Sequence, residues 1–426
     1  MTADWTHLCK KIGVRLAGTE NELRAAEYIR DRLRSAGCAG ATLEPFPCRS
    51  LRESQVQVSV LDGAVWKPVE CAAITGTNST PGSEPVEGEI VWIEMPEQMP
   101  QVTTLRGKIA ILVGPLPTDL GLHKRLVKAE PLAVIHVDHR LPFSWVKQDG
   151  AYPLWVQKYG FPPTVTIPYR EAWDWKRRDA RRARVLVRQT LAAADSCNVV
   201  AELPGTEPQS GALLLCAHHD TQAANEGADD NASGVVAVLE LARALARVPH
   251  RRTIRFVSFG TEEQLSVGAA AYAKRHAREL DRIALVLNFD SVSSVLGHFV
   301  LHRAANPRLS ALVESRLLES GLPVVASDEV SPFADHFIFT AQGVGAFWFM
   351  RESFPAGRWQ HHSVHDNLAN VSASELSRLL RAACELIDTL SEAPRALFRY
   401  HPSSEVRRRI QTLALELYGV RGRWGT

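Results

Sequence analysis

The feature that most constrains the fold of this chain is a regular alternation of strand-like and helix-like segments that begins near Asn198. Short apolar runs typical of buried strands occupy residues 212–217, 253–260, 283–289 and 345–350. Segments with apolar residues at helical spacing follow them, at 232–247, 266–280, 308–321 and 373–391. This alternation predicts an α/β fold with a mixed, largely parallel central sheet flanked by helices.

An earlier part of the chain has a different character. After a predicted helix at 16–36, short apolar runs are separated by Pro and Gly, with one helical stretch at "LGLHKRLVKAE". This pattern predicts a small β-rich domain inserted into the larger one. The predicted division is 1–54 for the first part of the catalytic domain, 55–190 for the insertion, 191–395 for the catalytic domain proper and 396–426 for a C-terminal helical extension.

Composition excludes several classes of partner. The 49 basic and 47 acidic residues leave a formal net charge of +2, which gives no reason to expect nucleic acid. The basic stretch 173–189 is better interpreted as a solvated helix of the insertion. No apolar run is long enough to span a membrane, and the N-terminus does not resemble a signal peptide, so we expect a cytoplasmic protein unless a longer precursor exists. A homo-oligomer is compatible with the sequence.

Charged and imidazole side chains follow the predicted strands directly. His218 and Asp220 come after the first, Glu262 and Glu263 after the second, and Asp290 after the third. The loops around the last strand carry Asp335-His336 and "QHHSVHD" (360–366), and "GADDNASG" (227–234) precedes a helix. Ligands of open α/β sheets collect beyond the carboxyl ends of the strands.

Several carboxylates at one edge would repel each other unless a cation were bound there. Imidazole and carboxylate ligands suit catalytic zinc, with cobalt or manganese as substitutes. The seven cysteines are scattered without a CxxC pair, so neither a thiolate site nor a disulfide framework is expected. His218 and Asp220 lie on one side of an extended strand end, and we expect Asp220 to orient the imidazole rather than bind metal.

The segments "AHHDT", "GADDNASGVVAVLELAR", "TIRFVSFGTEEQ", "NFDSV", "ADHFIF" and "HHSVHDN" occur in this order over residues 198–392. Together they resemble the zinc aminopeptidase family typified by aminopeptidase Y and the bacterial leucyl aminopeptidases. Glutamate carboxypeptidase II, glutaminyl cyclase and the transferrin receptor belong to the same superfamily. The insertion, with "LRGKIAILVG" and "PTVTIPYRE", resembles a protease-associated domain.

This resemblance implies two zinc ions and a specific set of ligands. The first ion would be held by His218 and Asp290 and the second by Glu263 and His362, with Asp230 bridging both. Glu262 would be the general base that works with a metal-bridged hydroxide, and Asp220 would be the second catalytic residue.

Other residues near these positions have subordinate or open roles. His361 takes the place of a common aromatic residue, and His362 is preferred as the ligand because its spacing to Asp366 matches the family. His336 is assigned only a supporting role, and Asp229 has no clear task. The resemblance also implies a cis peptide between Asp230 and Asn231.

The predicted function is that of a di-zinc aminopeptidase acting on peptides. A glutaminyl-cyclase-like enzyme and a carboxypeptidase remain alternatives on the same scaffold. A carboxypeptidase would need arginines near the site, and Arg351 and Arg358 are the candidates. A non-catalytic receptor-like protein is the alternative from another class, although such relatives lose metal ligands.

Overall fold

The computed structural model describes residues 1–426 except 95–103, 117, 139–143, 354–357 and 423–426. The chain divides into two compact units, one made of Met1–Arg49 and Ala193–Thr426 and the other of Ser50–Ala192. Two long strands, β1 (Ala39–Asp62) and β8 (Arg182–Leu203), each contribute residues to both units. The division into four parts at 54, 190 and 395 stays a prediction.

The first unit is built on a mixed sheet. Its strands are, in spatial order, β13 (Val324–Ser327), β12 (His298–Ala304), β14 (Ala346–Glu352), β11 (Ile283–Phe289), β9 (Ala212–His218), β10 (Thr253–Phe259) and β8. β9 runs parallel to both β10 and β11, and β11 runs parallel to β14. β8 and β12 run antiparallel to their neighbours β10 and β14. The predicted mixed, largely parallel α/β fold is confirmed.

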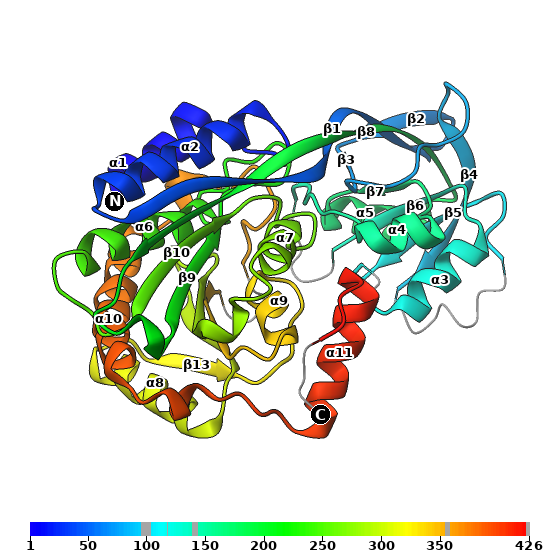
Figure 1. Ribbon diagram of the computed structural model, residues 1–426. Coiled ribbons are helices and arrows are strands. Elements are labelled where there is room, and N and C mark those ends of the chain that lie inside the picture. The colour runs from blue at the N-terminus through cyan, green and yellow to red at the C-terminus, as the bar shows by residue number, and fades with distance from the viewer. Residues whose placement is uncertain (95–103, 117, 139–143, 354–357, 423–426) are drawn as a thin grey trace. The chain divides into compact units, whose positions relative to one another are not determined.

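Helices cover both faces of this sheet, because the central strands are apolar on both sides. Leu213 and Leu215 of β9 pack in one core with α6 (Ala232–Leu245) and α10 (Ala373–Glu392). Leu214 and Cys216 of the same strand pack in another with α7 (Val267–Arg275) and α9 (His336–Ala341). Figure 1 shows the two helix pairs on opposite sides of the sheet. Continuous apolar runs, rather than alternating ones, follow from burial on both faces.

The first turn of α6 packs closely against the end of β11. A Cβ on Gly234 would lie 2.1 Å from the carbonyl oxygen of Phe289, so a larger residue would push the helix away. The side chain of Asn231 donates to the same oxygen at 2.9 Å and accepts from the amide of Gly234 at 2.8 Å. This packing brings Asp230, which precedes the helix, close to Asp290, which follows β11.

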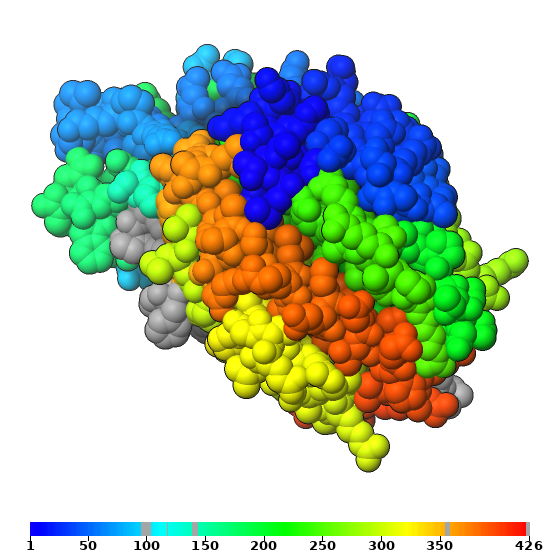
Figure 2. Space-filling model, turned by 90° about the vertical axis from the view of Figure 1, so that its left-hand side faces the viewer, coloured from blue at the N-terminus to red at the C-terminus, as the bar shows by residue number. Residues whose placement is uncertain are grey.

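The remaining helices of the first unit lie outside this centre. They are α1 (Thr2–Thr6), the π-helix His7–Ile12, α2 (Glu20–Ser35), α8 (Pro307–Glu319), α11 (Ser404–Tyr418) and short 3-10 turns at Pro208–Ser210, Leu280–Arg282, Leu368–Asn370 and Arg395–Phe398. α10 packs against α6 and α8, and Figure 2 shows these helices side by side on one face. The amphipathic α11 buries Ile410 and Ala414 against α9. No helix in the described ranges is long and apolar enough to cross a bilayer.

The second unit is β-rich, as the sequence predicts. Its further strands are β2 (Val65–Val69), β3 (Ala72–Ala73), β4 (Val86–Ile93), β5 (Lys108–Val113), β6 (Ala133–Val137) and β7 (Thr164–Thr166), and its helices are α3 (Leu120–Ala129), α4 (Pro153–Tyr159) and α5 (Tyr169–Arg177). β4, β5, β6 and β7 are consecutive parallel neighbours. The resemblance of this unit to a protease-associated domain stays a prediction.

Two predicted helices are shorter than expected. The helix predicted at 266–280 ends at Arg275, where His276 turns to contact Glu44 at 2.9 Å. The basic stretch 173–189 is helical only to Arg177, because its second half belongs to β8. In that half, alternate residues Ala183, Val185 and Val187 are buried, which is the period of a strand.

Candidate metal centre

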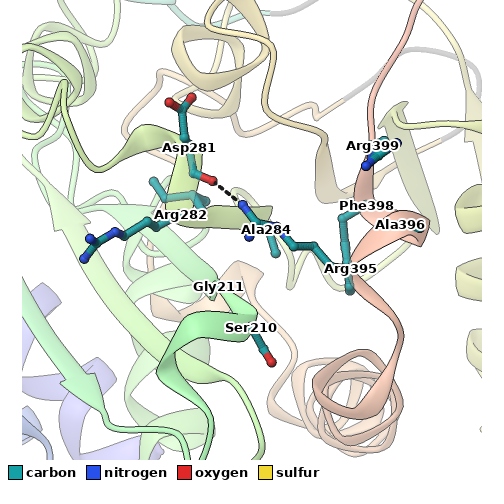
Figure 3. A pocket seen from close by; sticks show the side chains of 10 residues that line it. Ser210, Gly211, Asp281, Arg282, Ala284, Arg395, Ala396, Phe398 and Arg399 are labelled. Carbon is teal, nitrogen blue, oxygen red and sulfur yellow. Dashed lines mark hydrogen bonds between the residues drawn. The ribbon is translucent and has the colours of Figure 1, made fainter.

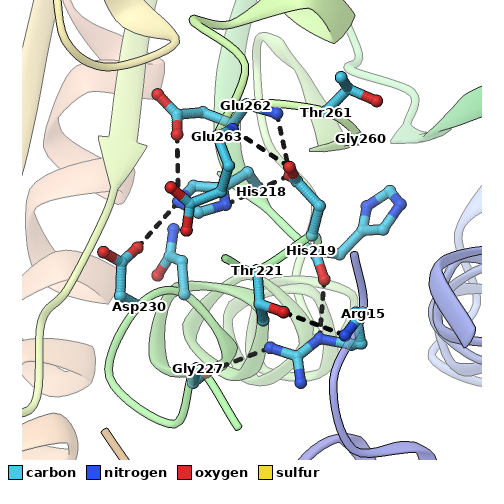
Figure 4. A network of polar contacts seen from close by, with 12 residues as sticks. Arg15, His218, His219, Thr221, Gly227, Asp230, Gly260, Thr261, Glu262 and Glu263 are labelled. Carbon is cyan, nitrogen blue, oxygen red and sulfur yellow. Dashed lines mark hydrogen bonds and ion pairs between the residues drawn. The ribbon is translucent and has the colours of Figure 1, made fainter. Parts of the chain in front are cut away.

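The side chains predicted to bind metal meet at the carboxyl edge of the first unit's sheet. His218 is the last residue of β9, Asp290 directly follows β11, and the Glu262-Glu263 pair lies three residues beyond β10. Because these strands are parallel, their carboxyl ends lie at one edge. Figure 4 shows Glu262, Glu263 and Asp230 gathered around the ring of His218.

One group of potential ligands consists of His218, Asp230 and Asp290. The Nε2 atom of His218 lies 3.1 Å from Oδ1 of Asp230 and 3.7 Å from Oδ1 of Asp290. All three side chains are buried. Burial opposes protonation of His218, but the charge of Glu262 and hydrogen bonds to the aspartates raise its pKa well above the usual value.

A second group shares Asp230 and brings in the other side of the site. Nε2 of His362 lies 3.5 Å from Oδ2 of Asp230 and 3.1 Å from Oε2 of Glu263. Nε2 of His361 lies 3.1 Å from the same Asp230 oxygen, and the two imidazoles stack with centroids 3.5 Å apart. Both histidines therefore face Asp230, but the recorded contact with Glu263 belongs to His362.

The donor chemistry of the two groups fits zinc. Each group combines imidazole nitrogen with carboxylate oxygen, and the two oxygens of Asp230 face different groups. The carboxylates of Asp230, Asp290 and Glu263 are buried close together, which costs free energy unless cations neutralise them. The number of ions and the identity of each ligand stay predictions.

Asp220 connects the two sides of the site from outside both ligand groups. Its Oδ1 lies 3.5 Å from Nδ1 of His218, on the far side of the ring from Asp230. Its two oxygens also accept hydrogen bonds from the amides of Glu262 at 2.9 Å and Glu263 at 3.1 Å. One carboxylate thus fixes the orientation of an imidazole and of both glutamates, which is how outer-shell carboxylates act in metal sites.

Glu262 has the position of a free carboxylate beside the ligands. Its Oε2 lies 3.8 Å from Nε2 of His218, and the hydroxyl of Ser266 donates to its Oε1 at 3.3 Å. Burial raises its pKa well above the usual value, and the charges of Asp335 and Asp290 add to that effect against the opposing charge of His218. Carboxylates with perturbed pKa values are typical of general acids and bases in active sites.

Comparison with known proteins agrees with this centre. The model of peptidase family M28 matches residues 198–387, which include all the side chains described above. Residues 198–387 belong to peptidase family M28.

Individual relatives are more distant. Bovine carboxypeptidase Q is 26% identical over 304 residues, covering 66% of this chain and 62% of that protein. Leupeptin-inactivating enzyme 1 of Streptomyces exfoliatus is 29% identical over 221 residues, covering 47% of this chain and 50% of that protein. The chain thus spans less than two thirds of the length of these curated relatives.

Solved structures match over nearly the whole chain. An M28 peptidase precursor from Shewanella amazonensis superposes with a TM-score of 0.81 at 20% identity, over 94% of this chain and 95% of the other. A zinc aminopeptidase from Bacillus subtilis superposes with a TM-score of 0.72 at 18% identity, over 94% and 97%. At such identities the likeness establishes the fold.

Asp366 and Asp229 shape the loop of the M28 segment that carries Asp230. The carboxylate of Asp366 accepts from the amides of Asp229 at 2.7 Å and Asp230 at 3.0 Å. The carboxylate of Asp229 accepts from the amide of Ser293 at 2.8 Å and from the side chain of Gln360 at 3.1 Å. Asp229 therefore joins three loops, a task that the sequence does not reveal. The predicted cis peptide between Asp230 and Asn231 is present.

His336 is placed differently from the other histidines of the M28 segment. Its buried ring packs on Trp348, with centroids 5.5 Å apart. Burial lowers its pKa to about 3, which indicates a neutral ring. Its predicted supporting role stays a prediction.

Sequence reasoning missed two residues of the centre, and it named a third, Arg358, only as a candidate for a carboxypeptidase. Gln222 donates to Oε2 of Glu263 at 3.0 Å. The buried Arg15 donates to backbone carbonyls of the loop after β9, including those of His219 and Gly227. Arg358 lies beside Asp230 and Asp290. Each comes from a loop or terminal segment without a periodic pattern, so only tertiary contacts reveal it.

A pocket lies at the opposite, amino edge of the same strands. A pocket of about 390 Å³ lies where β9 and β11 begin, and Figure 3 shows Arg395 crossing it toward Asp281 while Arg282 extends away. Its lining residues are Ser210, Gly211, Asp281, Arg282, Ile283, Ala284, Arg395, Ala396, Phe398 and Arg399. Arg395 donates to the carbonyl of Asp281 at 3.3 Å. None of these lining residues belongs to the possible metal-binding groups found among the described residues.

Proposed function

We propose that this chain is a di-zinc metalloexopeptidase, and specifically an aminopeptidase that hydrolyses the N-terminal bond of short peptides. The observation that carries the proposal is the pair of ligand groups that share Asp230, with the carboxylate of Glu262 beside them. The M28 match of residues 198–387 supports a peptidase.

His218 and Asp290 would hold one zinc ion, Glu263 and His362 the other, and Asp230 both. When bound, zinc would polarise the scissile carbonyl and lower the pKa of water. Two of these ligands are held from outside the ligand groups, since Asp220 faces His218 and Gln222 donates to Glu263. Such support keeps ligand geometry fixed during turnover.

Glu262 would move the proton during hydrolysis. As water adds to the carbonyl carbon, Glu262 takes its proton and then delivers it to the nitrogen of the leaving amine as the C–N bond breaks. The hydroxyl of Ser266 and the amide contact with Asp220 hold Glu262 in place. General acid–base catalysis of this kind contributes roughly 100- to 10,000-fold to rate.

The alternatives share the scaffold but differ in what they bind. A carboxypeptidase is favoured by the similarity to carboxypeptidase Q and by Arg358 beside Asp230. Arg351, the other arginine considered, is paired with Glu375 at 3.2 Å and donates to the carbonyl of Ser294. It therefore serves the structure rather than a substrate.

The test is metal quantification combined with a substrate panel. The full chain is loaded with zinc, and aminoacyl-nitroanilides, acidic dipeptides and a Gln-initiated peptide are offered. About two zinc ions per chain and release of nitroaniline are expected. About one ion with cyclisation of the N-terminal Gln would replace the proposal with the cyclase. Absence of zinc binding and of any hydrolysis would instead support a receptor-like protein.

A further inference from the structure

Arg252 is a fully buried arginine at the amino edge of the sheet, directly before β10. Its Nη2 donates to the carbonyl of Ala393 at 2.6 Å, and its guanidinium lies over the ring of Phe398, 4.6 Å from the centroid. Nε and Nη1 are buried without a hydrogen-bond partner in the part of the chain that the structure describes. Unpartnered donors of a buried charge cost free energy, so this side chain needs a further acceptor.

The carboxylates near Arg252 do not supply that acceptor. The charges of Glu207 and Glu392 act on it from a distance, but neither residue forms an ion pair with it among the described residues. Glu207 is instead paired with Arg251 at 2.8 Å. Burial and the positive charges of Arg251 and Arg395 lower the pKa of Arg252. Its surroundings therefore disfavour the positive charge that a bound anion would stabilise.

The unpartnered Nη1 of Arg252 borders the pocket of about 390 Å³ at the amino edge. Gly211, Ala284 and Phe398 all line that pocket. A Cβ built on Gly211 would lie 3.5 Å from Cβ of Ala284 and 3.7 Å from Nη1 of Arg252. Because glycine has no side chain, nothing from Gly211 separates this nitrogen from the pocket.

The lining of the pocket adds further positive charge. Arg282, Arg395 and Arg399 line it, and Asp281 is the carboxylate among the lining residues. Arg395 crosses the pocket, where it donates to a neutral acceptor, the carbonyl of Asp281, at 3.3 Å (Figure 3). Guanidinium groups from separate segments of the chain therefore meet at one pocket, and a single lining carboxylate opposes them.

We propose that this pocket binds a phosphate monoester of a small organic molecule, with the phosphate group held by Arg252, Arg395 and Arg399. A phosphate monoester carries about two negative charges at neutral pH and has three strong acceptor oxygens. Its oxygens point in different directions, whereas the two oxygens of a carboxylate lie in one plane. Guanidinium donors that approach from separate segments therefore fit a phosphate better.

The size and lining of the pocket favour an ester over free phosphate. Small-molecule sites usually have volumes of roughly 300–1,000 Å³, which exceeds what one phosphate group fills. Ile283, Ala284 and Phe398 give the pocket an apolar part against which an organic group can pack. The pocket shares no residue with the proposed zinc ligands, so this inference does not depend on the proposed peptidase function.

The test is calorimetric titration of phenyl phosphate into the zinc-loaded full chain, with benzoate as the carboxylate counterpart and inorganic phosphate as the free anion. The wild type should bind phenyl phosphate more tightly than either. Loss of charge-assisted hydrogen bonds in Arg252→Gln should raise the Kd for phenyl phosphate by roughly 10- to 100-fold. Arg395→Glu reverses an exposed charge, which the fold tolerates, and should raise the Kd by roughly 10-fold or more.

Control variants separate the pocket from the zinc ions, which also attract oxyanions. Arg308→Gln removes an exposed arginine from α8 and should keep the wild-type Kd. Arg282→Gln should change it little, since this side chain extends away from the pocket (Figure 3). An equal Kd for phenyl phosphate in the wild type, Arg252→Gln and Arg395→Glu would overturn the inference. Benzoate that binds as tightly as phenyl phosphate would overturn the choice of phosphate, and inorganic phosphate that does so would overturn the ester.

Discussion

The two edges of the central sheet differ in how they treat charge. At the carboxyl edge, His218 and Asp290 at the ends of β9 and β11 are buried with further carboxylates. At the amino edge of the same strands, the charged residues of the pocket are exposed, among them Arg282 and Arg395. Exposed charges are solvated and need no partner, whereas buried carboxylates need a cation. Apart from Arg252, burial of charge, rather than charge itself, therefore distinguishes the two edges.

The largest expected effect is that of Glu262→Gln, a substitution at the carboxyl edge, on kcat. Loss of the proton acceptor should lower kcat by about 100- to 10,000-fold. Zinc content should be unchanged, because Glu262 is not a proposed ligand. Asp281→Asn, the matched carboxylate-to-amide change in the amino-edge pocket, should leave both quantities at wild-type levels. Full activity of Glu262→Gln would contradict the assigned role.

The next comparison is between the two adjacent histidines. His362→Gln should lose one zinc ion per chain, because its imidazole contacts both Asp230 and Glu263. His361→Gln should retain both ions, since its recorded ligand contact is with Asp230 alone among the described residues. Metal analysis after dialysis against a weak chelator measures the difference. Loss of zinc from His361→Gln alone would reverse the assignment.

A smaller effect is expected from Asp220→Asn. An amide in this position can no longer offer two anionic oxygens to His218 and to the amides of Glu262 and Glu263. Changes to outer-shell partners cost roughly 10- to 100-fold in metal affinity. Competition with a chromophoric chelator would measure it, and an affinity equal to that of the wild type would show that Asp220 does not orient the ligands.

Which residues gather at the carboxyl edge of the sheet could largely be predicted from the sequence, because the ends of the strands could be predicted. Apolar runs locate β9, β10 and β11, and their parallel direction brings the residues that follow them together. The roles of Asp229 and Asp230 were not predictable from pattern alone. Adjacent residues in a loop point in different directions, and only the folded backbone sends Asp229 to Ser293 and Asp230 to His218.

Other parts escaped prediction for physical reasons. The sequence names Arg358 as a candidate near the site but not its contact with Asp230, because the two residues are 128 positions apart and a lone arginine in a loop has no periodicity that would indicate its direction. β12 contains His302 and Arg303 among apolar residues and was not recognised as a strand. The second half of the basic stretch 173–189 belongs to β8 but was assigned to a helix, because its charges obscured the alternate burial of Ala183 and Val185.

The smallest expected effect is on the pH dependence of stability, and it distinguishes His336, a histidine of the core, from the histidines that face the metal centre. Burial lowers the pKa of His336 to about 3, well below the value of about 6.5 expected in the unfolded chain. Below pH 6.5 the unfolded state binds a proton that the folded state does not, so stability falls as the pH decreases toward 3. Between pH 7.5 and 5.5 this amounts to about 1.4 kcal/mol. His336→Phe keeps an aromatic ring against Trp348, and in denaturant titrations its free energy of unfolding should fall by that much less than the wild type's over this pH range. The control His401→Phe, which changes an exposed histidine, should lose as much as the wild type. If the stability of His336→Phe depended on pH as that of the wild type does, the imidazole of His336 would be charged in the folded protein. His336 would then belong to the polar site rather than to the core.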